Sequence, residues 1–161
     1  MRAVILLAGM GLFSFAIAGC RSKAPQPPPA AKVDIVVSTD VNPDSARRPS
    51  PIVVRLYQLK EEGAFNSAGY FALADKEEAT LGSSLVAREE YELNPGVTRE
   101  LVLKIPPEAR YLAVVAGYRD LNNSKWKALS PAPESGLLDF VRKHKLVVKV
   151  GSSEVKIAPA N

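Results

Sequence analysis

Few residues of this chain have the chemistry of a catalytic or metal-binding site, and their small number excludes most such sites. The chain of 161 residues contains one cysteine, Cys20, and one histidine, His144. A single cysteine excludes an internal disulfide and any multi-cysteine zinc or iron–sulfur site, and a single histidine excludes a His-rich metal centre. His144 lies in the basic run 142–145, which is typical of a solvated strand end, so we do not expect it to be catalytic.

Carboxylates are more numerous, but those adjacent in the sequence do not form a general acid–base pair. Adjacent glutamates occur at 61–62, 77–78 and 89–90. Neighbouring side chains point apart in helices and strands, so only carboxylates distant in the sequence could meet in the fold. The chain also has no glycine-rich phosphate loop, HExxH zinc motif, GxSxG nucleophile motif or calcium loop. We therefore expect no enzyme activity, no metal ion or cofactor, and no small-molecule substrate.

The position of Cys20 is the clearest chemical signal in the sequence. Residues 3–18 carry no charge, follow a positive Met1-Arg2 start, and are fewer than the roughly 20 apolar residues that span a membrane. The run ends in Ile-Ala-Gly-Cys, which resembles the bacterial lipoprotein box. We therefore predict a signal peptide over residues 1–19, with covalent acyl groups such as palmitate and a diacylglycerol group on Cys20. An ordinary signal peptide followed by a chance cysteine is the alternative.

Residues 20–31 are predicted to form a lipidated, proline-rich tether. Residues 24–31 contain four prolines, which favour extended polyproline II structure over packing. Several acyl chains together hold a protein firmly to a membrane. Arg21 follows the cysteine, whereas an aspartate at this position signals inner-membrane retention in enteric-type bacteria. We therefore expect the protein to be anchored to the outer membrane and to face the periplasm.

The rest of the chain, residues 32–161, has the composition of one ordinary globular domain. Over the whole chain 47% of residues are hydrophobic, 24% are charged, and the formal net charge is +4. Basic residues are interspersed with acidic ones, so we expect no nucleic-acid partner. Apolar residues recur with a period of two between Gly, Pro and Asn turns, which is typical of β-strands. The predicted strands are 33–38, 52–59, 85–93, 98–105, 111–118, 146–150 and 154–157.

These short strands predict a mainly β fold, an antiparallel β-sandwich of seven or eight strands. Residues 85–93 and 98–105 are predicted to pair as a hairpin across the turn Asn94-Pro95-Gly96. Residues 111–118 are nearly all apolar, which favours a central strand covered on both faces. The segment 61–82 is the exception, because its pattern indicates a small helical insertion.

Within this insertion, Asp75 is predicted to cap a helix over residues 76–81. We expect the apolar side chains that precede this helix to seat the insertion on the sandwich. They are Phe65, Tyr70, Phe71 and Leu73.

The segment 39–51, between the first two predicted strands, is the most unusual connection. Its thirteen residues are polar, small or proline with one exception, where a minimal hairpin needs two to five. Long loops on a rigid sandwich are where binding residues tend to lie. A connector without a binding role is the alternative.

Several sequence blocks together resemble the TssJ family, the outer-membrane lipoproteins of type VI secretion systems. The resemblance covers residues from about Lys32 to the C-terminus and includes the lipoprotein box. Its most specific parts are Pro-Ile-Val-Val-Arg-Leu-Tyr-Gln-Leu at 51–59 and Ala-Gly-Tyr-Arg-Asp at 116–120. It further includes Asn42, Arg48-Pro49, Phe65, Phe71, Leu73, Thr80-Leu81-Gly82 and Trp126.

The resemblance implies a transthyretin-like sandwich and a non-enzymatic role. In this family the lipoprotein holds the periplasmic C-terminal domain of the inner-membrane protein TssM and, through it, TssL. The family's contact loop lies between strands one and two, and its length and composition vary. Here it maps onto Asp40, Val41, Asn42, Pro43, Asp44, Ser45, Ala46, Arg47 and Arg48.

A second function class stays open from the sequence alone. A periplasmic lipoprotein could instead bind a small ligand or inhibit an enzyme through an aromatic groove. The residues that would form such a groove are Tyr70, Phe71 and Trp126.

Overall fold

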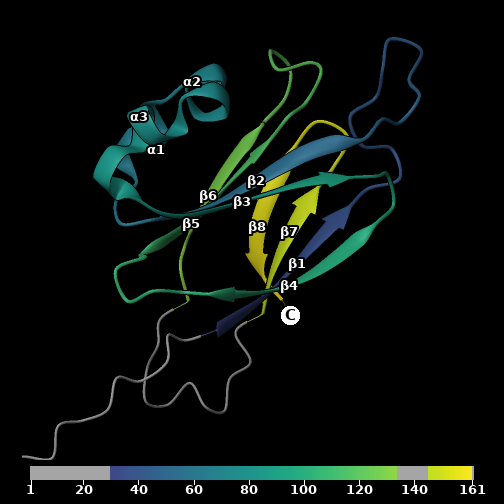
Figure 1. Cartoon of the computed structure of the whole chain (residues 1–161). Coiled ribbons are helices and arrows are strands. Elements are labelled where there is room, and N and C mark those ends of the chain that lie inside the picture. The colour runs from purple at the N-terminus through teal and green to yellow at the C-terminus, as the bar shows by residue number, and fades with distance from the viewer. Residues whose placement is uncertain (1–29, 134–144, 161) are drawn as a thin grey trace, which may run out of the picture.

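The computed structural model describes residues 30–133 and 145–160 of the chain. The predicted signal peptide, Cys20, residues 20–29 of the predicted tether, and His144 lie outside these ranges. The described residues form three layers, two four-stranded β-sheets and a layer of short helices (Figure 1). The predicted mainly β sandwich with a small helical insertion is therefore confirmed.

Sheet A has the strand order β4-β1-β7-β8, and sheet B has the order β3-β2-β5-β6. All neighbouring strands pair antiparallel except β1 and β7, which are parallel. The strands of sheet A are β1 (Ala30–Val37), β4 (Thr98–Lys104), β7 (Lys145–Val150) and β8 (Val155–Pro159). Those of sheet B are β2 (Ile52–Leu59), β3 (Leu85–Leu93), β5 (Tyr111–Ala116) and β6 (Lys127–Pro131).

The main core lies between the two sheets and is built by strand alternation. Every second residue of a strand points to the same side, so one face of each strand can enter this core. The fully buried side chains that β1 and β2 contribute are Val33, Ile35, Val37, Ile52, Val54 and Leu56.

A second core lies on the outer side of sheet B, under the helices. Tyr57 of β2 and Val115 of β5 face this side, opposite to the main core. The predicted two-sided burial of the strand in 111–118 is therefore confirmed, since Leu112 and Val114 face the main core. The Tyr57 hydroxyl donates to the carbonyl of Leu73 at 2.8 Å, and burial raises the pKa of Tyr57 to about 12.

Three helices cover this second core, α1 (Gly63–Ser67), α2 (Tyr70–Asp75) and α3 (Glu77–Leu81), followed by a 3₁₀ turn at Gly82–Ser84. Helices of five or six residues are not stable alone, so packing must hold them. Each helix buries one large apolar side chain, and these are Phe65, Leu73 and Leu81.

Two expectations for the insertion are wrong. Asp75 does not cap the last helix, because it is the final residue of α2 and the chain turns at Lys76 into α3. Thr80 makes the polar connection instead, since its hydroxyl donates to the carbonyls of Ala72 and Lys76. Phe71 does not seat the insertion either, because its side chain is 68% exposed.

The predicted hairpin across residues 94–96 is also wrong, because its two arms belong to different sheets. The turn itself forms, with Gly96 at a φ of 76°. However, β3 pairs with β2 and β4 pairs with β1, so the turn carries the chain from sheet B to sheet A. Leu93 and Leu103 face the same core from opposite sides. The alternation of apolar and polar residues predicts correctly which side chains point inward. It does not show whether two strands pair in one sheet or face each other across the core.

Sequence patterning did not reveal β6, and it placed the end of the 111–118 strand two residues late, since β5 ends at Ala116. β6 is a five-residue edge strand that ends at Pro131, and most of its residues are only half-buried. A proline is tolerated at such an edge because it has no N–H to contribute to a sheet.

Lys127, the first residue of β6, fastens the helical layer to sheet B. Its ammonium donates to three backbone carbonyls near the end of α1, those of Phe65 at 3.1 Å, Asn66 at 2.8 Å and Ala68 at 3.0 Å. The last carbonyls of a helix have no intrahelical partner, and a cation there also opposes the helix dipole. The ammonium also lies over the rings of Phe65 and Trp126. Burial lowers the pKa of Lys127.

Replacing Lys127 by Met is expected to destabilise the domain by about 2–3 kcal/mol, because the carbonyls lose their charge-assisted donor. The measurement is the midpoint of thermal unfolding, which should fall by several degrees. The control is Lys125→Met, since Lys125 is 78% exposed and its ion pair with Glu154 contributes little. Equal stability of the two variants would contradict the fastening role.

Candidate partner-binding surface

Four connections meet at one end of the sandwich, here called the loop end (Figure 1). They are the β1–β2 loop (38–51), the β3–β4 turn (94–97), the β5–β6 loop (117–126) and the β7–β8 turn (151–154). Backbone hydrogen bonds join them. The Ser38 carbonyl accepts from Gly96 N at 3.2 Å, Ser152 O accepts from Asn42 N at 3.2 Å, and Ser153 O accepts from Lys125 N at 2.9 Å.

Asn42 ties the base of the β1–β2 loop to the neighbouring loop. Its side-chain amide donates to the carbonyl of Pro51 at 2.8 Å and accepts from the backbone N–H of Arg119 at 2.8 Å. The residue is 4% exposed and has a φ of 47°, a left-handed conformation that asparagine tolerates better than most residues. The two ends of the loop are thus fixed to each other and to the β5–β6 loop.

The loop tip, residues 43–49, is closed by a ring of bonds between Asp44 and Arg48. The Asp44 backbone N–H donates to Arg48 O at 2.9 Å, and the Asp44 carboxylate accepts from the Arg48 backbone N–H at 2.9 Å. The Arg48 guanidinium contacts the same carboxylate at 2.7 Å. The Arg48 backbone N–H and then its guanidinium lower the pKa of Asp44. The tip is therefore a shaped turn.

The nine candidate residues divide into a buried base and an exposed tip. Val41 is 0% exposed and Asn42 is 4% exposed, so these two support the loop from inside. Pro43 and the residues from Ser45 to Arg48 are exposed, as is Asp40, whose carboxylate accepts from the Ser38 hydroxyl. Asp44 is half-buried beside Arg48. Because Arg48 is engaged by Asp44, Arg47, with a φ of 60°, is the cation that the tip presents outward.

The block Ala-Gly-Tyr-Arg-Asp at 116–120 contacts several neighbouring segments at the loop end. A side chain at Gly117 would meet the hydroxyl of Tyr70 at 2.9 Å. Tyr118 is buried, its hydroxyl donates to Gly151 O at 3.1 Å, and burial raises its pKa. Arg119 contributes its backbone N–H to Asn42. None of the predicted site residues lies in this block, and the family resemblance was the one sequence signal that marked it.

The aromatic groove is not supported by the structure. The ring of Tyr70 packs edge-on against Phe71 and against Trp126, with both pairs of ring centroids 5.4 Å apart. These rings therefore fill the space between one another. A small hollow lies elsewhere, between the two sheets at the edge made by β3 and β4.

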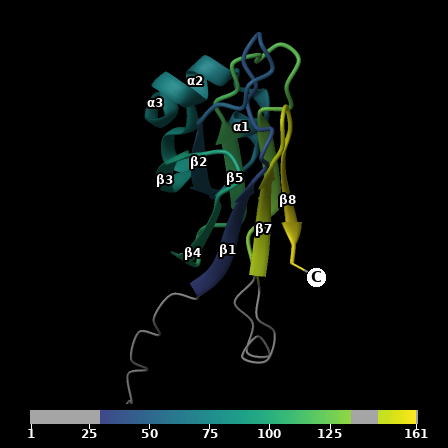
Figure 2. The ribbon, with the colours of Figure 1, turned by 90° about the vertical axis from the view of Figure 1, so that its right-hand side faces the viewer.

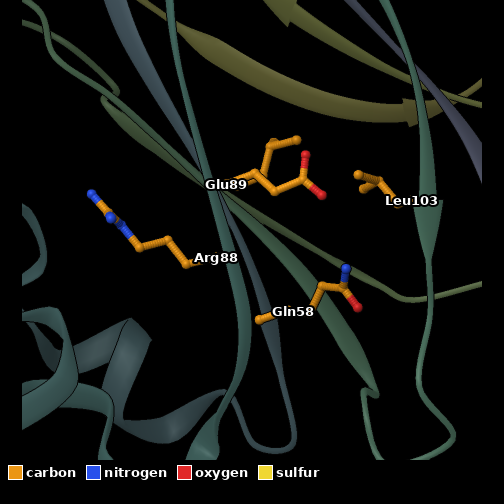
Figure 3. Close-up of a pocket in the computed structure, with 6 residues that line it drawn as sticks. Gln58, Arg88, Glu89 and Leu103 are labelled. Atoms are coloured by element: carbon orange, nitrogen blue, oxygen red, sulfur yellow. The ribbon is translucent and has the colours of Figure 1, made fainter.

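This hollow is a shallow depression of about 140 Å³ that is partly open to solvent (Figure 3). Figure 3 shows Gln58, Glu89 and Leu103 pointing into the gap between the sheets, whereas Arg88 points away from it. The Glu89 carboxylate accepts from the hydroxyl of Tyr91. Arg88 instead pairs with Glu77 of α3 at 2.8 Å, so it joins the helical layer to β3.

Over residues 30–133 and 145–160, no three His, Cys, Asp or Glu side chains gather in a way that could hold a metal ion. Within the same ranges, no helix has the length and apolar character needed to cross a membrane.

Comparisons with known proteins place the chain in a family. Residues 29–153 match the family model described as "Type VI secretion lipoprotein, VasD, EvfM, TssJ, VC_A0113". No curated protein matches the chain. Among solved structures, the T6SS lipoprotein TssJ1 from Pseudomonas aeruginosa matches with a TM-score of 0.76 and 32% identity over 84% of this chain and 98% of that one.

Two further structures share the fold. Serratia marcescens Lip, described as a membrane-bound component of the type VI secretion system, matches with a TM-score of 0.72 and 26% identity. That match covers 83% of this chain and 97% of Lip. A structure titled "T6SS protein TssM C-terminal domain (869-1107) from EAEC" matches with a TM-score of 0.64 and 22% identity, over 81% of this chain and 98% of the matched chain.

The family match and the TssJ1 likeness agree with the transthyretin-like sandwich described above. Because the family model covers most of the chain, the chain belongs to the TssJ family of type VI secretion lipoproteins.

Proposed function

We propose that this protein is the outer-membrane lipoprotein that binds the periplasmic C-terminal domain of TssM and so links the type VI secretion membrane complex, including TssL, to the outer membrane. In this proposal residues 1–19 are the removed signal peptide, residues 20–31 are the lipidated tether, and residues 32–161 are the binding domain. The protein acts by binding and has no catalytic residue. The shaped tip of the β1–β2 loop on a rigid base carries this proposal.

The physical basis of the binding is pre-organisation. A flexible loop loses conformational freedom when it docks, and this loss reduces affinity. Here Asn42 fixes the base of the loop, and the Asp44–Arg48 ring fixes the tip before any partner arrives. The exposed guanidinium of Arg47 then offers planar donors to a carboxylate or carbonyl group of TssM.

The lipid anchor adds to the binding by confinement. Both partners are held in one envelope compartment, which raises their effective concentration, so a modest intrinsic affinity suffices. The similar structures are in keeping with this choice of partner, because they come from type VI secretion systems and one is named for the TssM C-terminal domain.

The role of Asn42 is tested by replacing it with Ala. Both amide hydrogen bonds are lost and a left-handed residue is strained, so we expect a loss of stability on the order of 2 kcal/mol. Binding to the TssM domain, measured by calorimetry, should weaken because the loop must then be ordered on docking. The comparison variant is Asn42→Asp, which keeps the acceptor for Arg119 and lacks the donor to Pro51. Unchanged stability and affinity of the Ala variant would refute the pre-organisation.

The contact at the tip is tested by Arg47→Glu. If Arg47 meets an acidic or carbonyl group of TssM, charge reversal should weaken binding by at least about tenfold and leave the unfolding midpoint unchanged. Lys60→Glu is the matched control, because Lys60 follows the opposite end of β2 and its substitution changes the charge equally. Equal affinity of both variants and the natural protein would sink the assignment of the tip as the contact.

The anchor is tested by Cys20→Ser in cells. Without the acyl chains the protein should appear in the soluble periplasmic fraction, incorporate no labelled palmitate, and no longer support type VI secretion. Ser22→Ala, which leaves the cysteine intact, is the control and should stay with the outer membrane. Normal secretion by the Cys20→Ser strain would argue against the tethering role.

A further inference from the structure

The outer side of sheet A carries lysines from all four of its strands. The helices cover the outer side of sheet B, and among the described residues no helix lies on the outer side of sheet A (Figure 2). We call this surface the basic face. Its lysines come from all four strands and are Lys32, Lys104, Lys145, Lys149 and Lys156. Its carboxylates are those of Asp34 and Glu100 and, at its β8 edge, Glu154.

Strand pairing brings several of the lysines directly opposite each other. Lys32 of β1 is in register with Lys145 of β7, and Lys149 of β7 is in register with Lys156 of β8. Like charges directly opposite in a sheet are destabilising. Asp34 relieves part of this repulsion through its ion pair with Lys145 at 2.6 Å, and Glu154 does the same through its ion pair with Lys156 at 2.7 Å. The excess of positive charge remains and suits a negative surface outside the domain.

The form of the face indicates an extended surface as its partner. Its charges are spread over all four strands of the sheet. Val102 is 68% exposed and Val36 is 38% exposed among these lysines. Lysines interspersed with exposed apolar side chains fit a bilayer surface, where lysines meet phosphates and apolar groups enter the headgroup region.

The position of the chain entry makes such a surface available. β1, which begins at Ala30, belongs to sheet A, and its first exposed lysine is Lys32. The start of β1 and the start of β7 lie at the same end of the sheet, since the two strands are parallel (Figure 2). This step rests on the proposed function, in which residues 20–31 lead from this end to a lipid anchor.

We propose that the basic face of sheet A lies against anionic phospholipid headgroups of the membrane to which the protein is anchored. The lysines then lie within a Debye length of the headgroup phosphates, where salt screens their attraction only in part. The helical layer faces away from the membrane. The attraction is weak by itself, so the acyl chains supply the anchoring and the basic face sets the orientation of the domain.

The test is sedimentation of the unacylated mature chain, residues 20–161 with Cys20→Ser, with lipid vesicles. Vesicles of phosphatidylcholine and phosphatidylglycerol should bind the protein, vesicles of phosphatidylcholine alone should not, and added salt should weaken the binding. The combined variant Lys32→Gln, Lys149→Gln and Lys156→Gln should bind anionic vesicles about 100-fold more weakly, at about fivefold per lysine.

The matched control removes three positive charges from other parts of the surface. It carries Lys60→Gln, Lys76→Gln and Arg110→Gln, all at exposed positions outside sheet A, and should keep most of the binding. Equal loss of binding in both variants would overturn the proposal, because net charge alone would then explain it. Absence of binding to anionic vesicles would also overturn it and would favour an acidic protein surface as the partner of this face. Neither result depends on TssM affinity or on palmitate incorporation, which report separately on the proposed function.

Discussion

The fold depends on two central strands, β2 and β5, whose side chains are buried on both faces. One face of this pair meets sheet A, and the other would expose large side chains such as Tyr57 and Val115 to water. Covering it requires a third layer, and the insertion between β2 and β3 supplies that layer with helices too short to be stable alone. The hydrogen bonds that Tyr57 and Lys127 donate to carbonyls of the helical layer therefore help to hold these short helices on sheet B.

The packing of the two sheets against each other also shapes the loop end. The strands hold the ends of their connections at fixed positions, and the two short turns bond to the two longer loops across this end of the sandwich. The long β1–β2 loop could be loose in this setting, but Asn42 and the Asp44–Arg48 ring remove most of its freedom. Such a loop is suited to binding another protein, because its conformational entropy is already lost when the domain folds.

Two regions of the surface carry positive charge in different arrangements. The loop tip presents one outward arginine within a locally balanced group, whereas the outer side of sheet A carries repeated lysines on an uncovered sheet. A single positioned cation suits a specific contact with another protein, and a broad lysine surface suits a diffuse negative surface. A lipid-anchored adaptor would use both kinds of contact, because its domain has to stay near the membrane and also present its loop to a partner.

The amino-acid sequence by itself determined the strands other than β6, because alternation of apolar and polar residues reports which side of each strand is buried. It likewise determined the two-sided burial of β5, the presence of a helical insertion, and the family resemblance that the comparisons confirm. Only the tertiary structure decided which strands β3 and β4 pair with. Leu93 and Leu103 point inward whether their strands pair or face each other across the core, so the pattern could not reveal that the turn at Gly96 crosses between sheets. The roles of Asn42 and Lys127 likewise depended on tertiary contacts, since their bonding partners, Arg119 and the carbonyls of α1, are about sixty to eighty residues away in the chain.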